Sequence, residues 1–218
     1  MPTALQPNTI VDAPFELKLP DVATGGASVL MIGSTRCGKT TALKYILKKY
    51  FKDHIGVVFS ESARSPAYAD MKHKNLPLSS AWVPELIKDM YKINKDTKNH
   101  YDFMVILDDM PSVKFEKELL KLTTIYRNSN LSSICCVQSP SLLTPTQRSN
   151  FNFVMLFKSN TTAQTEANIK AYLRGVFPQG ANYEEKIRAM TQMCEDHHFI
   201  LIDNLNGTIQ RCKIDLGK

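Results

Sequence analysis

Residues 33–40 read GSTRCGKT and fit the pattern GxxxxGK(S/T), in which a glycine-rich loop surrounds a phosphate group. The octet follows a short apolar run, SVLMI (28–32), and precedes ALKYILKKYF (42–51), where leucine and isoleucine recur at helical spacing. Gly33 and Gly38 permit backbone conformations in which successive N–H groups face an anion, and the N-terminus of the following helix adds its dipole. The sequence here therefore predicts a strand, a phosphate-binding loop and a helix, in that order.

The polar residues of this loop indicate a nucleoside triphosphate as its ligand. The Lys39 ammonium group is expected between the β- and γ-phosphates, and the Thr40 hydroxyl is a candidate Mg²⁺ ligand. ATP and Mg²⁺ are therefore the expected cofactors. We expect the nucleotide to be bound by the whole loop, that is by Gly33, Ser34, Thr35, Arg36, Cys37, Gly38, Lys39, Thr40 and Thr41.

Two acidic residues follow another apolar run downstream. The run FMVIL (103–107) ends in Asp108 and Asp109, a pattern in which a buried strand delivers carboxylates beside the phosphate loop. Asp108 is expected to hold the Mg²⁺ shell together with Thr40. Asp109 is placed to polarise the attacking water, and Glu61 is a fallback for that role. An acid beside the metal-binding aspartate favours hydrolysis over phosphoryl transfer to a metabolite.

The residues around this acidic pair also separate classes of nucleotide hydrolases. A GTPase would carry DxxG after the strand and an NKxD motif that recognises guanine. Here Met110 and Pro111 follow the acids, and in NKDT (94–97) the aspartate comes one place too early. The sequence therefore disfavours GTP as the substrate.

Gln138 follows a further apolar run, SICCV (133–137). If this strand lies between the two motif strands, the Gln138 side chain lies near the γ-phosphate and can hydrogen-bond the attacking water. An inserted strand of this kind marks the additional-strand class of P-loop NTPases. Two arginines, Arg127 in IYRNSN and Arg148 in TQRSNF, are candidates to stabilise charge on the γ-phosphate, most usefully from a neighbouring subunit.

The rest of the chain alternates apolar, strand-like runs with amphipathic helical ones. Further strands are expected at 55–59, 153–157 and 199–202, with an Asn206-Gly207 turn and an edge strand at 209–214. Helices are expected at 83–94, 111–126, 162–176 and 183–194, whereas 60–80 has the composition of a loop.

These elements predict the fold class and the domain organisation. Because the strands are continuous apolar runs between helices, we predict a three-layer α/β sandwich around a mostly parallel central sheet. Residues 1–27 are expected to form an N-terminal arm. Residues 28–218 are expected to form one P-loop ATPase domain with C-terminal helices and a hairpin.

The charge balance bears on the partner. The chain has 218 residues, with 27 Lys+Arg against 21 Asp+Glu, which gives a formal net charge of +6. The excess permits an acidic partner such as DNA without proving one. Two groups are candidate DNA contacts, namely Lys72-His73-Lys74 and the set Lys92, Lys95 and Lys98.

The five cysteines form no CxxC pair, which argues against a disulfide framework and for a reducing compartment. Cys37 precedes a helix N-terminus, which we expect to lower the pKa of its thiol. Cys194, His197 and His198 lie close in sequence but lack the fourth ligand that a zinc site needs. With no signal peptide and no apolar run long enough to span a membrane, we expect an intracellular, soluble protein.

Over residues 29–203 the chain resembles the FtsK–HerA superfamily, and within it the poxvirus A32-like genome-packaging ATPases of large double-stranded DNA viruses and virophages. The matching segments are GSTRCGKT, SES, VILDD, YRNSNLSSICCVQSP, LTPTQRSNFNFVMLF and FILIDN. The resemblance matches Gln138 to the sensor glutamine of the family, and Arg148 to the arginine of its Arg-x-Asn segment. Arg127 is kept, although its neighbours differ from the Gly-Arg-His-like segment of the family.

The resemblance implies a ring-forming motor, a pentamer or hexamer, that uses ATP hydrolysis to thread double-stranded DNA into a preformed capsid. The implied partners are DNA bound without regard to sequence, further copies of the chain and a capsid protein at a portal vertex, with no membrane span. The implied location is the host cytoplasm at the site of virus assembly, with the virion as a second location. The positive net charge suits a channel that holds phosphates.

Three other functions stay open at this point. A cellular or conjugative DNA pump belongs to the same superfamily, although we see no membrane anchor or added DNA-binding domain. A nucleoside or nucleotide kinase would need a lid with several arginines, and no such cluster is visible. A non-catalytic nucleotide-dependent module is disfavoured, because Lys39, Thr40 and the two aspartates are all in place.

Overall fold

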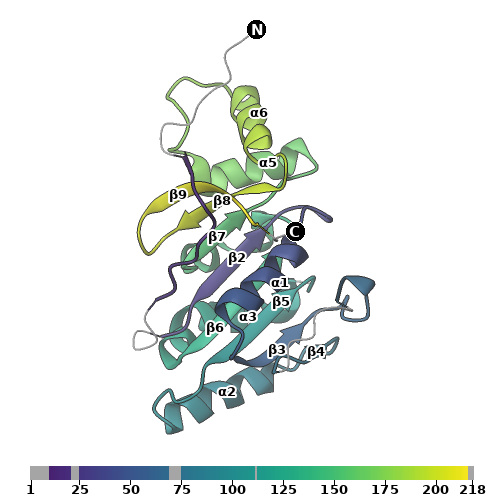
Figure 1. Ribbon diagram of the computed structural model, residues 1–218, viewed down its shortest axis with the longest axis vertical. Coiled ribbons are helices and arrows are strands. Elements are labelled where there is room, and N and C mark those ends of the chain that lie inside the picture. Colours follow the sequence, from purple (N-terminus) through teal and green to yellow (C-terminus); the bar gives the residue numbers. More distant parts are fainter. Residues whose placement is uncertain (1–9, 21–24, 69–74, 111, 216–218) are drawn as a thin grey trace.

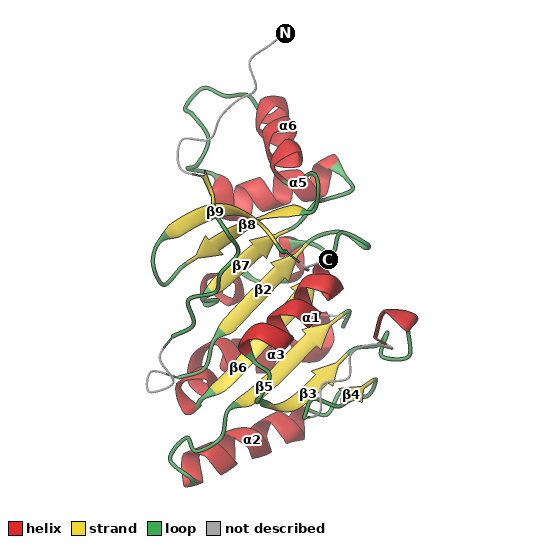
Figure 2. Ribbon diagram, in the orientation of Figure 1, coloured by secondary structure: helices red, strands yellow, loops and turns green. Residues whose placement is uncertain are grey.

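The computed structural model describes residues 10–20, 25–68, 75–110 and 112–215. In these ranges nine strands form one sheet, in the order β1-β9-β8-β7-β2-β6-β5-β3-β4, with helices on both faces (Figures 1 and 2). The strands are β1 (Val11–Asp12), β2 (Ser28–Ile32), β3 (Ile55–Phe59), β4 (Leu78–Ser79), β5 (Phe103–Asp108), β6 (Leu131–Val137), β7 (Phe153–Leu156), β8 (His198–Asp203) and β9 (Thr208–Lys213).

The helices fall between these strands as the alternating pattern predicts. The α-helices are α1 (Lys39–Tyr50), α2 (Pro84–Asp96), α3 (Ser112–Lys121), α4 (Pro145–Ser149), α5 (Thr162–Asn168) and α6 (Tyr183–Met193). Two π-helical segments, η3 (Leu122–Tyr126) and η6 (Ile169–Leu173), continue α3 and α5. The short 3₁₀ turns are η2 (Pro66–Tyr68), η4 (Arg127–Ser129) and η5 (Pro140–Leu142).

The strand directions confirm the predicted fold class. The phosphate-loop strand β2 lies between β6 and β7 and is parallel to both. Strand β5 is parallel to β6 and to β3. The antiparallel pairs of the described sheet are β7–β8 and β8–β9. The sheet is therefore mostly parallel, and its central strands are buried on both faces.

The alternation of side chains along the strands divides the core into two layers. In β2, Leu30 and Ile32 point into one hydrophobic cluster, and Val29 and Met31 point into the other. The second cluster is covered by α1, which crosses the near face of the sheet in Figure 1. Buried residues of α2, α3, η3, η6 and α6 belong to the first cluster, on the opposite face. Helices, sheet and helices make three layers.

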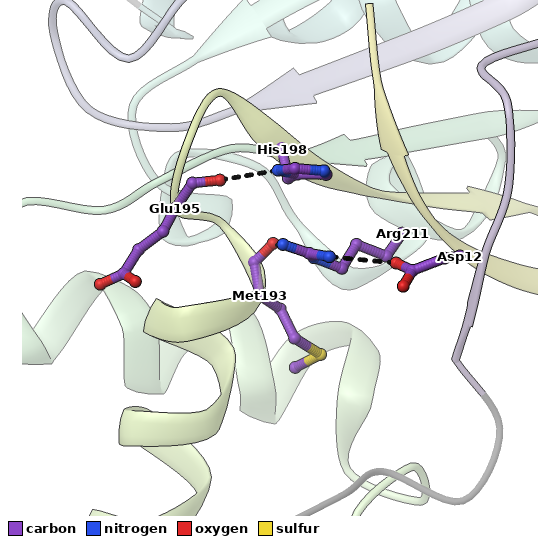
Figure 3. Close-up of polar contacts among 5 residues, drawn as sticks. All are labelled: Asp12, Met193, Glu195, His198 and Arg211. Atoms are coloured by element: carbon purple, nitrogen blue, oxygen red, sulfur yellow. Dashed lines mark hydrogen bonds and ion pairs between the residues drawn. The ribbon is translucent and has the colours of Figure 1, made fainter. Parts of the chain in front are cut away.

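The prediction of an edge strand at 209–214 is wrong in one respect. The strand exists as β9, but β1 pairs with it in parallel, so β1 is at the edge. Arg211 of β9 holds this corner together: its Nη1 donates to Asp12 Oδ1 at 3.1 Å, and its Nε donates to the Met193 carbonyl at 2.9 Å (Figure 3). Beside it, the His198 ring nitrogen Nδ1 lies 2.9 Å from the Glu195 carbonyl. Apolar periodicity gave no signal for a strand of two residues.

Two further segments refine the sequence-based expectations. Residues 60–80 were expected to be a loop, and their described part also contains η2 and β4, which pairs in parallel with β3. The turn between β8 and β9 spans four residues rather than two, because Asp203 pairs with Thr208. The Asp203 carboxylate accepts the backbone N–H groups of Leu205 and Asn206, which fixes that turn.

The N-terminal arm contributes to the domain core. Phe15 and Leu17 are buried in the cluster under α1, and the Leu17 N–H donates to the Tyr50 hydroxyl at 3.1 Å. The division at residue 27 stays a prediction, although part of the arm packs as core. In the described ranges, no helix combines the length and the apolar character that crossing a membrane requires.

Candidate active site

A cavity of about 700 Å³ opens beside the phosphate loop. Residues 35–41 line it together with Asp108, Asp109 and Gln138. Asp108 is the last residue of β5, Asp109 follows it, and Gln138 follows β6. In a parallel sheet the carboxyl ends of neighbouring strands meet at one edge, where α/β proteins bind ligands. The topology therefore brings the loop, both acids and the glutamine to one place, although they are far apart in the sequence.

The phosphate loop holds its shape through contacts of its own. The Lys39 Nζ donates to the carbonyls of Gly33 and Ser34, at 2.6 and 2.8 Å. Arg36 and Gly38 have positive φ, 63° and 99°, which turns the backbone around the loop. At Gly33 a Cβ would stand 2.7 Å from the Cys37 sulfur and 2.7 Å from the Phe157 Cβ, so this position needs glycine.

Ser34 connects the phosphate loop to the segment that follows β7, which includes the start of α5. Its hydroxyl donates to Gln164 Oε1 at 2.8 Å and accepts the Asn160 N–H at 2.6 Å. Ser34 itself is buried, so the connection lies beneath the loop rather than in solvent. Gly33 and Ser34 thus support the cavity, whereas the other predicted loop residues line it.

The expectation of a lowered Cys37 pKa is wrong. The thiol is largely removed from water, and this desolvation raises its pKa above the ordinary value. The Lys39 ammonium group, whose nitrogen lies 3.9 Å from the sulfur, acts in the opposite direction but is outweighed. Cys37 is therefore a neutral, half-buried thiol at neutral pH.

Asp108 is the buried acid of the pair, with 4% of its surface exposed. Its Oδ2 accepts a hydrogen bond from the Tyr68 hydroxyl, which in turn accepts one from Ser60 Oγ at 3.3 Å. Burial raises the pKa of the Asp108 carboxyl, while the Tyr68 hydrogen bond and the nearby charge of Lys39 lower it. Burial likewise raises the pKa of the Tyr68 phenol, helped by the Asp108 charge, so the phenol stays a hydrogen-bond donor.

Asp109 is the first residue after β5. It has a positive φ of 52°, and its Oδ2 accepts a hydrogen bond from the Ser62 hydroxyl. The segment after β3 thus contacts both acids, through Tyr68 and Ser62. Thr40 and Asp108 line one cavity and offer the hydroxyl and carboxylate oxygens that Mg²⁺ prefers, so these residues fit that ion.

The inserted strand is confirmed by the strand order. Strand β6 pairs with β2 on one side and β5 on the other, so it separates the two motif strands. Gln138, one residue beyond β6, lines the cavity as its position requires. Glu61 is exposed and is absent from the described lining, whereas Ser62, Ser65 and Tyr68 of the same segment belong to it.

The two arginines lie outside the cavity of their own chain. Arg127 precedes β6, at the sheet edge opposite the phosphate loop, and its Nη1 donates to the Asn150 carbonyl at 3.1 Å. Arg148 Nη1 donates to the Pro140 carbonyl at 3.0 Å. Neither side chain lines the described cavity. A role for either one at a γ-phosphate therefore requires a second subunit and stays a prediction.

Sequence reasoning missed the apolar wall of the cavity. Phe157, Phe199 and Ile214 line it, and the rings of Phe157 and Phe199 stack at 5.1 Å between centroids. His197 also lines the cavity, with a positive φ of 63°. Phe157 directly follows β7, His197 directly precedes β8, Phe199 lies in β8 and Ile214 follows β9. Phe157 and Phe199 lie in segments that carry the family resemblance, but no spacing in the sequence assigned them to the cavity. Only the adjacency of β7 to β2 would have revealed them.

The remaining sequence candidates have other surroundings. Cys194 Sγ donates to the Leu156 carbonyl at 3.6 Å. Across the described residues no three His, Cys, Asp or Glu side chains are grouped to hold a metal ion. The candidate DNA contacts Lys72, His73 and Lys74 lie outside the described residues.

Comparison of the sequence finds relatives in large DNA viruses, and no family model matches the chain. Uncharacterized protein 075L of Invertebrate iridescent virus 6 is 27% identical over 193 residues, which cover 83% of this chain and 71% of that protein. Uncharacterized protein 015R of Frog virus 3 is 26% identical over 203 residues, 86% of this chain and 60% of that protein. The chain thus spans only part of each relative.

Comparison of the structure finds solved ATPases. The genome packaging NTPase B204 from Sulfolobus turreted icosahedral virus 2, solved with AMP, superposes with a TM-score of 0.58 at 13% identity, over 88% of this chain and 98% of that one. The pCW3 conjugation coupling protein TcpA superposes with a TM-score of 0.63 at 13% identity, over 86% of this chain and 60% of that one.

The fold and the cavity together define a P-loop NTPase fold of the additional-strand class. The structural neighbours include a viral genome packaging NTPase, a conjugation coupling protein and the cytoplasmic domain of a Type VII secretion ATPase, and the sequence relatives are viral. The comparisons therefore agree with the resemblance to A32-like packaging ATPases that the sequence motifs indicated.

Proposed function

We propose that this chain is an ATP-hydrolysing motor that translocates double-stranded DNA into a viral capsid. The observation that carries the proposal is the convergence of Lys39, Asp108 and Gln138 on one cavity, from three adjacent parallel strands and the loops that follow them. Its support in context is the likeness of the fold to a genome packaging NTPase and the viral origin of the sequence relatives.

The residues of the cavity have separate roles in the proposed reaction. The loop N–H groups and Lys39 would hold the β- and γ-phosphates, and Mg²⁺, when bound, neutralises charge on those groups. Thr40 and Asp108 would hold the ion. Asp109 would polarise the attacking water, and Gln138 would orient that water or detect the loss of the γ-phosphate.

The proposed assembly supplies what a single chain lacks. Because Arg127 and Arg148 lie away from the cavity of their own chain, a ring of five or six copies would let one of them act on a neighbour's γ-phosphate. The proposed partners are double-stranded DNA, further copies of this chain and a capsid protein at a portal vertex. The proposed locations are the host cytoplasm and the virion.

The testing experiment is steady-state ATP hydrolysis with and without long double-stranded DNA, over a salt series. A translocase is expected to be stimulated strongly by DNA, and the stimulation should fall as salt rises, because phosphate contacts release counterions. The Lys39→Ala variant serves as the control for contaminating ATPases. Turnover that ignores DNA at every salt concentration would count against the motor and favour a kinase.

A conjugative-type DNA pump is the second candidate, since the fold also superposes on a conjugation coupling protein. The two functions differ in the partner that the motor needs. A packaging motor is expected to co-sediment with empty capsids of its virus, and a pump is not. Stimulation by DNA combined with no capsid association would favour the pump.

A further inference from the structure

The solvent-facing side of α1 carries a concentration of lysines. The helix buries Ala42, Leu43, Ile46 and Leu47 against the sheet, and it has no acidic residue along its length. Its outward residues and the turn that follows contribute Lys44, Lys48, Lys49 and Lys52. We refer to these four residues as the α1 lysine face. In the described ranges α1 is the helix that covers this side of the sheet (Figure 2).

The α1 lysine face holds much of the net charge of the molecule. Residues 44–53 contain four lysines and one aspartate, so this segment accounts for three of the six net positive charges. Lysines in the last turn of a helix are stabilised by the helix dipole, which accounts for Lys48 and Lys49. The dipole does not account for Lys44 in the middle of the helix or for Lys52 beyond its end.

Three lysines on other helices lie close to acidic residues. On α2 the Lys88 Nζ lies 3.8 Å from Glu85 Oε1, and that helix carries as many acids as lysines. Lys121 and Lys170 also form ion pairs, with Glu118 and Glu166. Among the described residues, Lys44, Lys48 and Lys52 have no acidic partner. Helix α2, which carries Lys92 and Lys95 of the group that the sequence suggested, thus has no net charge, whereas α1 carries four lysines and no acid.

Lys49 is held by aromatic contacts instead. Its Nζ lies 3.3 Å from the Tyr45 hydroxyl, and 5.5 and 5.2 Å from the ring centroids of Tyr45 and Tyr50. These contacts fix the ammonium group at the surface without neutralising its charge. The α1 lysine face therefore combines one cation that aromatic contacts hold in position, Lys49, with three lysines that have no acidic partner among the described residues.

We propose that the α1 lysine face binds the phosphate backbone of double-stranded DNA, an inference that rests on the proposed function. Lys44 and Lys48 lie about 6 Å apart along the helix axis, which spans roughly two phosphates of one DNA strand. Lysine is a point charge that binds phosphate without reading bases, as a motor that moves along any sequence requires. Because α1 begins at Lys39, one helix would join the nucleotide site to the DNA contact.

The test compares two triple variants that remove the same charge from different helices. One carries Lys44→Gln, Lys48→Gln and Lys52→Gln, and the matched control carries Lys88→Gln, Lys92→Gln and Lys95→Gln. The dissociation constant for a fluorescent DNA duplex is measured over a salt series for both variants and the wild type. Thermal melting and DNA-independent ATP hydrolysis show that each variant is folded.

The expected result is a change in the salt dependence of the α1 variant alone. Each phosphate contact contributes about 0.9 to the slope of log K against log salt, so losing three contacts should reduce the slope by about 2.7. The α2 control should keep the wild-type slope. Equal slopes for the α1 variant and the wild type would overturn the inference, as would equal losses in both variants.

Two outcomes separate this inference from the proposed function. If the wild type binds no duplex even at low salt, the proposed motor fails and the inference fails with it. If the wild type binds and is stimulated by DNA while the α1 variant behaves like the wild type, only the inference fails. Loss of binding to vesicles of anionic lipid, with DNA binding unchanged, would assign the face to a membrane surface and overturn the proposal.

Discussion

The Tyr68 hydroxyl donates a hydrogen bond to Oδ2 of Asp108, across 40 positions of the sequence. Tyr68 is 5% exposed, and Ser60 donates to the same hydroxyl, so the phenol is held from two sides. The contact fixes Oδ2 of Asp108, the carboxylate that would hold Mg²⁺ in the proposed site. Partners of this kind fix the orientation of a metal-binding carboxylate.

Tyr68→Phe is therefore expected to weaken Mg²⁺ binding about 10-fold, within the range seen when such supporting contacts are removed. Calorimetric titration of the nucleotide-bound protein with Mg²⁺ measures the effect directly, and the Mg²⁺ dependence of hydrolysis should shift with it. Tyr45→Phe removes a hydroxyl away from the cavity and is the control. Unchanged Mg²⁺ affinity, with a lower melting temperature alone, would make Tyr68 a packing residue.

Asp108→Asn is the reference for that experiment. It keeps the size of the side chain but removes the charge proposed to hold Mg²⁺, so its loss of Mg²⁺ affinity should exceed that of Tyr68→Phe. If Asp108→Asn leaves Mg²⁺ binding unchanged, the proposed metal site itself is wrong, whatever Tyr68 does.

Lys39→Ala should abolish ATP hydrolysis and leave the fold intact. The ammonium group bonds two loop carbonyls, and in the proposed reaction it stabilises charge on the transferred phosphoryl group, a contribution on the order of 10²–10³ in kcat for one such donor. Hydrolysis assays and a thermal melt of the same preparation measure both parts. Residual activity within tenfold of the wild type would argue against the phosphate-loop assignment.

The sequence was enough to place the motif-bearing strands and the loop, because an apolar run next to a special spacing is a local signal. The position of β6 between β2 and β5 entered as a condition on the role of Gln138 rather than from periodicity, and the strand order confirms it. The contacts of Tyr68 and the apolar wall of Phe157 and Phe199 did not follow. They depend on which strands become neighbours, and that is a property of the topology that no local pattern carries.

Cys37 is expected to react slowly with iodoacetamide at pH 7, more slowly than a free cysteine. Burial raises the pKa of the Cys37 thiol above its ordinary value, so the thiolate fraction at neutral pH is below that of a free thiol and grows as pH rises. The labelling rate is followed by mass spectrometry from pH 7 to 10. It should rise at a higher pH than the labelling rate of glutathione. Fast labelling at pH 7 would show that the helix N-terminus outweighs burial.

The other four cysteines provide an internal comparison for that measurement. All four are buried in the described structure, and burial raises the pKa of each thiol. Labelling of the native protein should therefore be confined to Cys37, and bound nucleotide should slow it, because Cys37 lines the cavity.

Arg127→Ala distinguishes a residue that acts in a neighbouring subunit from an internal anchor. In the proposed ring, mixing the variant with wild type should reduce hydrolysis more than in proportion to the variant added. If Arg127 only holds the Asn150 carbonyl, the mixture should show proportional activity and a lower melting temperature. Arg148→Ala, which removes a bond to the Pro140 carbonyl, is run in parallel to decide between the two arginines.

Phe15→Ala should destabilise the domain by about 3 kcal/mol, the lower end of the range for removing a buried phenylalanine ring. Phe15 is 6% exposed, and its ring centroid lies 5.2 Å from that of Phe199, which lines the cavity. Loss of the ring should therefore also weaken nucleotide binding. Denaturant unfolding measures the first effect and nucleotide titration the second.

Val11→Ala, at a residue 64% exposed, is the control and should change stability by less than about 0.5 kcal/mol. If both variants match the wild type, residues 1–27 are an appendage that the domain does not need, because the ring of Phe15 would then contribute nothing to the core beneath α1.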